Sequence, residues 1–206
     1  IFIGVFSVWN RWSRCQIAIT IVAKLVNNKI EIDIFKELSK IAYTMETLCD
    51  DKDNYQDLAE KYLVNSRNCF YIGRSMDYFV CLEASLKLKE ISYIQTEGFA
   101  AGELKHGTIA LIEHNTPVIA VISQENINLN TRSNIKEVKA RGAATMVISM
   151  RKLSQETDDI VIDDVNELLS PLATIIPAQY LAYYAALLKD CDIDKPRNLA
   201  KSVTVE

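Results

Sequence analysis

The stretch PVIAVIS, residues 117–123, is the cleanest strand pattern in the chain. It follows the polar turn EHNT and carries no charge over its seven residues. A continuous apolar run, in place of strict alternation, is typical of a strand that is buried on both faces. We therefore expect residues 117–123 to lie inside a parallel sheet.

Similar short runs lie on both sides of this stretch. They are CFYIG at 69–73, ATMVISM at 144–150 and DIVID at 159–163. Helical patterns over 78–94, 127–141 and 172–189 separate or follow them. Strands that alternate with helices predict an α/β fold, and right-handed crossovers favour a three-layer α/β/α arrangement with a mostly parallel, flavodoxin-like sheet.

The first quarter of the chain has a different pattern. Residues 15–28 are a strongly apolar helical run, and residues 33–49 and 52–64 repeat apolar residues at helical spacing. A helical segment is therefore expected before the sheet.

Composition excludes several classes of protein. Hydrophobic residues make up 49% of the chain and charged residues 24%, which is typical of a folded domain, and the net charge of −4 predicts no nucleic-acid partner. The nine-residue apolar run at the start is too short to span a bilayer, so we expect no membrane partner. The missing initiating Met and the unusual first 14 residues suggest an end cut from a longer chain.

The cysteines and histidines give no metal signature. Five scattered cysteines form no Cys-x-x-Cys pair, and the chain has only two histidines. A zinc site has almost no ligands to draw on, so we expect no metal, free thiols and a cytoplasmic location.

One helical stretch carries charges that could do chemistry. Glu83, Lys87 and Glu90 recur at i, i+4 and i+7, which places them on one helix face. An exposed charge ladder is the ordinary interpretation of such spacing. Apolar Phe79, Leu86 and Ile94 share the stripe, however, so we expect the Glu90 carboxylate to be partly buried.

Two further segments have either a functional or a purely structural interpretation. His106 lies between Gly102 and Gly107, where the backbone is expected to turn sharply or approach a neighbour closely, but a lone histidine is more often structural. The segment YIGRSMD, with Arg74 and Ser75, could place backbone N–H groups near a phosphate, but one glycine is a weak signal.

Two motifs taken together resemble a known family. LEASLKLKEISYIQTEGFAAGELKHG (82–107) and PRNLAKSVTVE (196–206) closely resemble the C-terminal half of the glucosamine-6-phosphate synthase family, also called glutamine–fructose-6-phosphate aminotransferase (isomerizing). The resemblance runs from about residue 15 to residue 206. It implies sugar-isomerase (SIS) modules, fructose-6-phosphate as substrate, glucosamine-6-phosphate as product, and no cofactor.

The resemblance also implies residue roles. Glu90 would be the base that moves a proton between C1 and C2 of the sugar, and Lys87 would assist at the charged intermediate. His106 would help to open the sugar ring across a homodimer interface. Lys201 would form an imine with the open-chain ketose.

Two further residues are implied as substrate contacts. Ala200 lies beside Lys201 in the LAKS motif. Ser7 lies in IGVFS, which resembles a family IGVAS motif, although the residues that follow Ser7 depart from the family pattern. By the same resemblance Arg74 and Ser75 would be structural.

The resemblance divides the chain into three parts. Residues 1–50 would be a remnant and terminal helices of a first SIS module, residues 51–190 a second SIS domain, and residues 191–206 a tail that forms an active-site lid. The glutaminase domain and most of the first SIS module, with its phosphate-binding loop, would be supplied by the rest of the same chain. We therefore expect the fragment to fold and dimerise but to be inactive as a synthase by itself.

Two alternatives stay open. A non-catalytic SIS module would bind a sugar phosphate or only mediate dimerisation, and would not need a lysine at a fixed place in its tail. A stand-alone phosphosugar isomerase would carry its own Ser/Thr-rich phosphate loop, and GRSMD is poor in hydroxyls.

Overall fold

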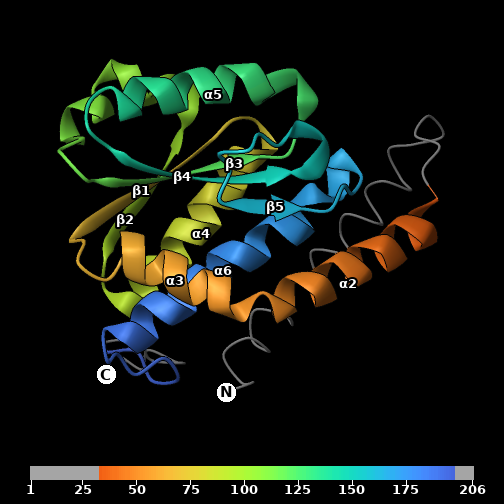
Figure 1. Cartoon of the computed structure of the whole chain (residues 1–206), viewed down its shortest axis with the longest axis horizontal. Helices are drawn as coiled ribbons and strands as arrows, with labels where there is room; N and C mark the ends of the chain where they lie inside the picture. Colours follow the sequence, from red (N-terminus) through yellow and green to blue (C-terminus); the bar gives the residue numbers. More distant parts are fainter. Residues whose placement is uncertain (1–32, 198–206) are drawn as a thin grey trace, which may run out of the picture.

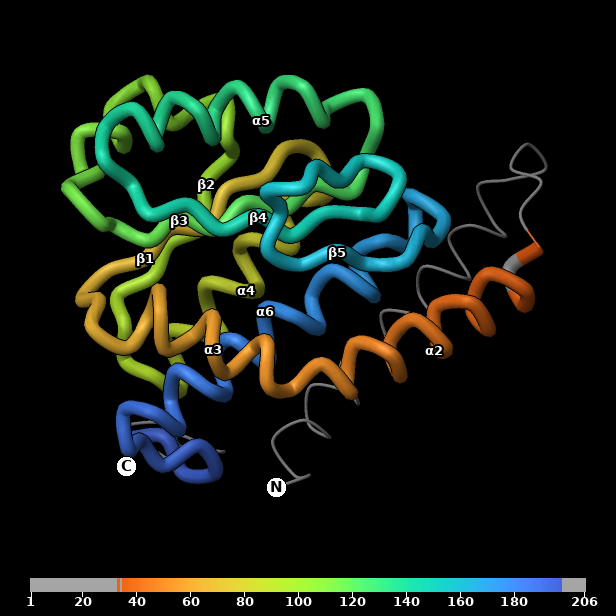
Figure 2. Tube along the Cα trace, in the orientation of Figure 1, coloured from red at the N-terminus to blue at the C-terminus, as the bar shows by residue number. Residues whose placement is uncertain are grey.

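The computed structural model describes residues 33–197. Within them five parallel strands form one sheet in the order β2-β1-β3-β4-β5 (Figures 1 and 2). The strands are β1 Asn68–Gly73, β2 Gln95–Ala100, β3 Pro117–Ile122, β4 Ala144–Met150 and β5 Ile160–Ile162. This strand order is that of flavodoxin-like folds, so the predicted fold class is confirmed.

Helices cover both faces of the sheet. They are α2 Ile34–Asp50, α3 Lys52–Tyr62, α4 Met76–Ser92, α5 Glu125–Lys139 and α6 Ser170–Leu188. Figure 1 shows α5 on one face and α3, α4 and α6 on the other, with α2 extending past α6. The predicted helical segment before the sheet is present as α2 and α3, whereas the predicted helix 15–28 lies outside the described residues.

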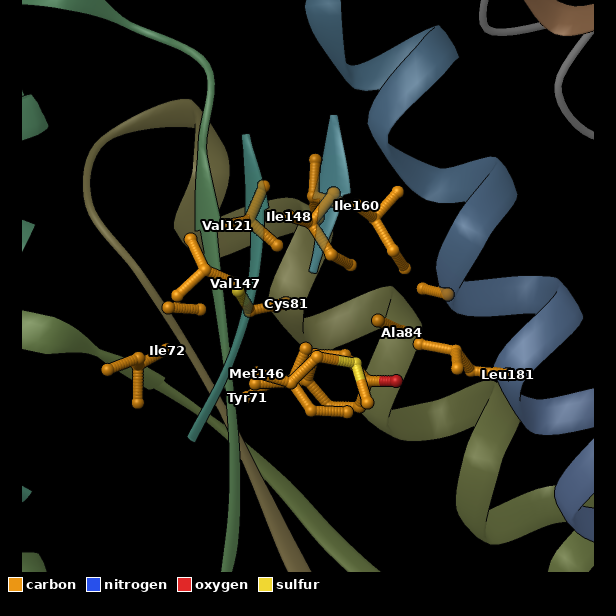
Figure 3. Close-up of a cluster of buried hydrophobic side chains, with 14 of the residues drawn as sticks. Tyr71, Ile72, Cys81, Ala84, Val121, Met146, Val147, Ile148, Ile160 and Leu181 are labelled. Carbon is orange, nitrogen blue, oxygen red and sulfur yellow. The ribbon is translucent and has the colours of Figure 1, made fainter. Parts of the chain in front are cut away.

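The core lies between the sheet and the α4–α6 pair. The close-up in Figure 3 shows Tyr71, Met146 and Ile148 from the strands facing Ala84 of α4 and Leu181 of α6. Every residue of β3 is buried, as its continuous apolar run predicts. Residues 167–188, which include α6, are apolar and long enough to cross a bilayer, but most of their length is buried within the protein, as expected of a core helix.

One strand was not predicted. The sequence pattern favours a single helix over residues 78–94 and no strand after it, whereas α4 ends at Ser92 and β2 begins at Gln95. β2 is an edge strand that pairs only with β1, and its burial is uneven, so it lacks the apolar run of an inner strand. Gly98 suits this place because an added Cβ would lie 2.7 Å from the backbone oxygen of Cys81 on α4.

Candidate active site

The charged row expected on the long helix is present near the end of α4. Lys87 Nζ lies 2.8 Å from Glu90 Oε2 and 3.8 Å from Glu83 Oε1. The side chains of Lys87 and Glu90 retain 21% and 29% of their exposure, so the pair is partly buried yet open to a ligand. Spacings of three and four residues on a helix bring such side chains together.

The apolar neighbours of this row are arranged differently from the expectation. Phe79 and Leu86 were expected to shield Glu90, but they are 67% and 44% exposed in this chain. Ile94 alone of the three is buried. Phe79, Leu82 and Leu86 thus form an exposed apolar row beside the charged one.

The C-terminal segment, Cys191–Arg197, contacts the end of α4 at Ser92 and Tyr93. Tyr93 ends the helix in a left-handed conformation, with φ of 60°. Arg197 donates its backbone N–H to the Tyr93 hydroxyl at 2.9 Å and places its guanidinium 4.0 Å from the ring centre. This contact lies three residues beyond Glu90.

His106 lies at the end of the short 3₁₀ helix η1, Ala101–His106, and is exposed. Gly107 after it has φ of 144°, which favours glycine, and a Cβ on Gly102 would lie 3.1 Å from the Arg74 guanidinium. The two glycines therefore mark a sharp turn and a close approach, as expected. An ion pair of 3.3 Å between Lys105 and Glu137 ties η1 to α5.

Glu90 and His106 lie toward opposite ends of the edge strand β2. Glu90 precedes the start of β2 by five residues, and His106 follows the end of β2 by six residues. A strand of six residues is about 20 Å long. The fold of one copy therefore does not bring these two side chains together, and Ser7, Ala200 and Lys201 lie outside the described residues.

The strand order reverses between β1 and β3, where α/β folds usually bind ligands. Arg74 follows β1, but its guanidinium is bonded to Asn134 Oδ1 at 3.0 and 3.2 Å, in keeping with a structural role. Ser75 makes no capping hydrogen bond and has φ of 54°.

A buried polar network at this place was not predicted. Asp77 accepts the backbone N–H of Ser123 at 2.9 Å and contacts the Ser123 hydroxyl, which lies 2.7 Å from the Ser170 hydroxyl. Ser170 in turn donates to the carbonyl of Glu167 at 2.8 Å. These contacts join the starts of α4 and α6 to the end of β3.

Three oxygen–oxygen contacts connect Asp77, Ser123, Ser170 and the Glu167 carbonyl, and the Ser123 hydroxyl donates to the Asp77 carboxylate. Burial raises the pKa of Asp77 to about 6, against the hydrogen bonds from Ser123, which lower it. The available sequence signal was Ser123, a polar residue directly after the apolar run of β3.

Cys69 and Cys81 are fully buried, and burial raises the pKa of the Cys81 thiol well above its usual range. Over residues 33–197, no group of three His, Cys, Asp or Glu side chains is arranged to hold a metal ion.

Comparisons with known proteins agree on one family. The SIS domain family matches residues 62–189. A glutamine–fructose-6-phosphate aminotransferase (isomerizing) of Shouchella clausii is 59% identical over 185 residues, and that of Bacillus subtilis is 60% identical over 177 residues. These matches cover 90% and 86% of this chain but 31% and 30% of the relatives, so the chain spans less than a third of their length.

Solved structures give the same result. The C-terminal domain of glucosamine-fructose-6-phosphate aminotransferase from Francisella tularensis superposes with a TM-score of 0.72 at 32% identity, over 78% of this chain and 46% of that one. A glucosamine-6-phosphate deaminase of Thermotoga maritima superposes with a TM-score of 0.69 at 23% identity, over 89% of this chain and 52% of that one, which shows likeness of fold alone.

Proposed function

The chain belongs to the SIS domain family, and we propose that it forms the isomerase part of a cytoplasmic glutamine–fructose-6-phosphate aminotransferase. That enzyme would convert fructose-6-phosphate and glutamine-derived ammonia to glucosamine-6-phosphate. The similarity to aminotransferases of this name over about nine-tenths of the chain supports the proposal. So does the likeness to the C-terminal domain of the Francisella tularensis enzyme.

The observation that carries the proposal is the Lys87–Glu90 pair at the end of α4. The proposed reaction removes a proton from C1 of the sugar and returns one to C2, so it needs a positioned base. The Glu90 carboxylate is held by Lys87 at 2.8 Å and remains partly exposed, so a substrate can reach it. The Lys87 ammonium is also available to stabilise negative charge that develops on the intermediate.

The proposed covalent step uses Lys201. Its neutral amine would add to the C2 carbonyl of the open-chain ketose, and loss of water would give an imine. Ammonia would then displace the lysine from C2. Transfer of one proton from C1 to Glu90 gives an enolamine, and protonation at C2 with loss of the C1 hydroxyl proton gives the amino aldose.

His106 would act in a second copy of the chain. We propose that it assists ring opening in the site to which another copy contributes Glu90. This arrangement accommodates the separation of the two residues toward opposite ends of β2 in one copy. It also requires the homodimer expected from the sequence.

The chain by itself is proposed to be inactive as a synthase. In this account residues 51–190 are a second SIS domain, residues 1–50 include helices of a first one, and residues 191–206 form a lid. The first SIS module of the same chain would supply the phosphate-binding loop, and its glutaminase domain would supply the ammonia. The relatives, of which this chain spans less than a third, have room for both.

A hybrid enzyme tests the proposal. The chain replaces the matching part of the Bacillus subtilis aminotransferase, to which it is 60% identical. Glucosamine-6-phosphate formation and glutamine hydrolysis are then measured separately, and the chain alone serves as the comparison. We expect synthesis by the hybrid and none by the chain alone.

The second candidate is a non-catalytic SIS module that binds sugar phosphate or mediates dimerisation. The separation of Glu90 from His106 within one copy favours it over a complete stand-alone isomerase. It predicts a hybrid that hydrolyses glutamine and dimerises but forms no glucosamine-6-phosphate.

A further inference from the structure

His106 ends the short helix η1, which has little support of its own. Of the six residues of η1 only Ala101 and Leu104 are buried. A 3₁₀ helix is rarely this long, because its hydrogen bonds are poorly aligned. At Gly107, directly after η1, an added Cβ would meet nothing within 4 Å. The conformation of η1 therefore depends on contacts with other elements.

Arg74 makes the first of these contacts. A Cβ on Gly102 would lie 3.1 and 3.2 Å from the two Nη atoms of Arg74 and 3.3 Å from its Cζ. The guanidinium thus packs against the backbone of η1. Its Nε and Nη2 both donate to Asn134 Oδ1, at 3.2 and 3.0 Å. Asn134 lies on α5 and is only 2% exposed, so a contact shielded from solvent fixes Arg74 to α5.

Glu137 and Lys105 make the second contact. Glu137 lies one turn after Asn134 on α5, and Asn134 Nδ2 donates to Glu137 Oε2 at 3.5 Å. The other carboxylate oxygen, Oε1, pairs with Lys105 Nζ at 3.3 Å. Lys105 directly precedes His106, so η1 is held near its start by Arg74 and near its end by Glu137. We call Arg74, Asn134, Glu137 and Lys105 the η1 clamp.

The two contacts should differ in strength. The Lys105 side chain is 55% exposed, so its ion pair is screened by water and contributes little. The contact between Arg74 and Asn134 is charge-assisted, and loss of Arg74 would leave the buried Asn134 oxygen without its donor. Arg74 is therefore the strong point of the clamp and Glu137 the weak one.

We propose that Arg74, Asn134 and Glu137 are positioning residues, which hold η1 in the conformation that presents His106 to a second copy of the chain. The inference rests on the proposed function, in which His106 assists ring opening in the site that contains Glu90 of another copy. A group that moves protons must lie within hydrogen-bonding distance of them, so a displaced η1 lowers the rate even when His106 is intact. None of the three positioning residues touches the sugar in this account.

Hydrogen exchange of the chain and its variants tests the clamp without an enzyme assay. Arg74→Met keeps the length of the side chain and removes the guanidinium. Exchange of the η1 amides should then rise at least about ten-fold, as expected for loss of a hydrogen bond from a charged group. Arg74→Lys keeps the charge and should restore part of the protection. Unchanged exchange in Arg74→Met would show that the clamp does not hold η1, and would overturn the proposal.

Glu137→Gln is a second variant, at a partly exposed position where the fold should tolerate the change. It removes the ion pair with Lys105 and should raise exchange of the η1 amides about two-fold. Lys152→Gln is the matched control, because Lys152 pairs with Glu167 at 3.0 Å in an ion pair of comparable exposure after β4. Its loss should leave exchange of the η1 amides unchanged.

Mixed dimers of the hybrid enzyme test the positioning role. The first copy carries Glu90→Gln and the second carries His106→Gln, so the one intact site takes His106 from the first copy and Glu90 from the second. Arg74→Met in the first copy, which supplies His106, should lower the restored synthesis rate about ten-fold, with KM for fructose-6-phosphate unchanged. Arg74→Lys in that copy should regain part of the rate. Arg74→Met in the second copy, which supplies Glu90, should leave the restored rate unchanged.

The remaining outcomes separate this inference from the proposed function. An equal loss of rate with Arg74→Met in either copy would indicate a general structural effect and overturn the positioning role. Faster exchange with an unchanged rate would show that the clamp holds η1 without positioning His106, which overturns the role as well. If the mixture without Arg74→Met restores no synthesis, the shared site fails and the positioning role fails with it, while exchange still decides whether the clamp forms.

Discussion

Ser123 binds both oxygens of the Asp77 carboxyl group, one through its backbone N–H at 2.9 Å and the other through its hydroxyl. Asp77 is fully buried at the start of α4, and Ser123 follows the end of β3. The pair joins the helix that carries Glu90 to the central strands of the sheet.

Asp77 should make the stability of the chain fall as pH rises from about 4 to about 6. Burial raises its pKa from the ordinary 3.8 to about 6, so within this window the folded chain holds a proton that the unfolded chain has lost. The stabilisation is fully present below the pKa of Asp77 in the unfolded chain. It is lost as pH rises through the pKa of Asp77 in the folded chain. The loss amounts to about 3 kcal/mol at most.

Asp77→Asn isolates this effect, because the amide can accept from the Ser123 N–H and donate to the Ser123 hydroxyl at every pH. The free energy of unfolding, measured in urea, should increase for the variant relative to the natural chain between about pH 4 and pH 7. Parallel curves for the two proteins would contradict a raised pKa of Asp77 in the folded state.

A buried ion pair between Arg132 and Asp158 should be far more important to folding than an exposed one. Arg132 Nη2 lies 2.7 Å from Asp158 Oδ2, with 9% and 0% of the side chains exposed. Burial raises the pKa of Asp158, but hydrogen bonds from Arg132 and Ser149 outweigh it and lower the pKa. Asp158→Asn leaves a buried cation without its counter-charge and should cost about 3–5 kcal/mol of unfolding free energy.

Asp163→Asn is the control for that substitution. Asp163 pairs with Arg151 at 2.8 Å, but the two side chains are 39% and 63% exposed. Its loss should cost less than about 1 kcal/mol in the same urea measurement. Equal costs for the two variants would show that burial does not set the strength of these pairs.

Much of the fold follows from local patterns. β1, β3 and β4 are buried runs bounded by turns, and the helix expected from residue 33 begins after Asp33, whose side chain accepts the N–H of Lys36 at 3.1 Å. β2 was missed because an edge strand with Gln95 and Glu97 exposed has no apolar run to mark it.

The site was less predictable than the fold. Helical spacing brings Lys87 to Glu90, so that contact could be foreseen. The exposure of Phe79 and the network of Asp77, Ser123 and Ser170 depend on which elements become neighbours in space. Spacing within one helix contains no such information.

Mixing two inactive hybrids tests whether a site draws on two copies. One hybrid carries Glu90→Gln and the other His106→Gln. If Glu90 and His106 of different copies share a site, each mixed dimer regains one intact site, and random mixing restores about a quarter of the natural synthesis rate. The mixture is made by unfolding and refolding the two together, and each hybrid refolded alone is the control. No recovery would contradict the shared site.

The most direct test of the central claim compares two neighbouring carboxylates on α4 in the hybrid enzyme. Glu90 and Glu83 both lie near Lys87 Nζ, at 2.8 and 3.8 Å. Glu90→Gln should lower glucosamine-6-phosphate formation about 10²–10⁴-fold, as expected for loss of a general base, while glutamine hydrolysis continues. Glu83→Gln should leave synthesis within about three-fold of the natural rate. Synthesis by Glu90→Gln at a rate near that of Glu83→Gln would contradict the assignment of Glu90 as the proton-transfer base.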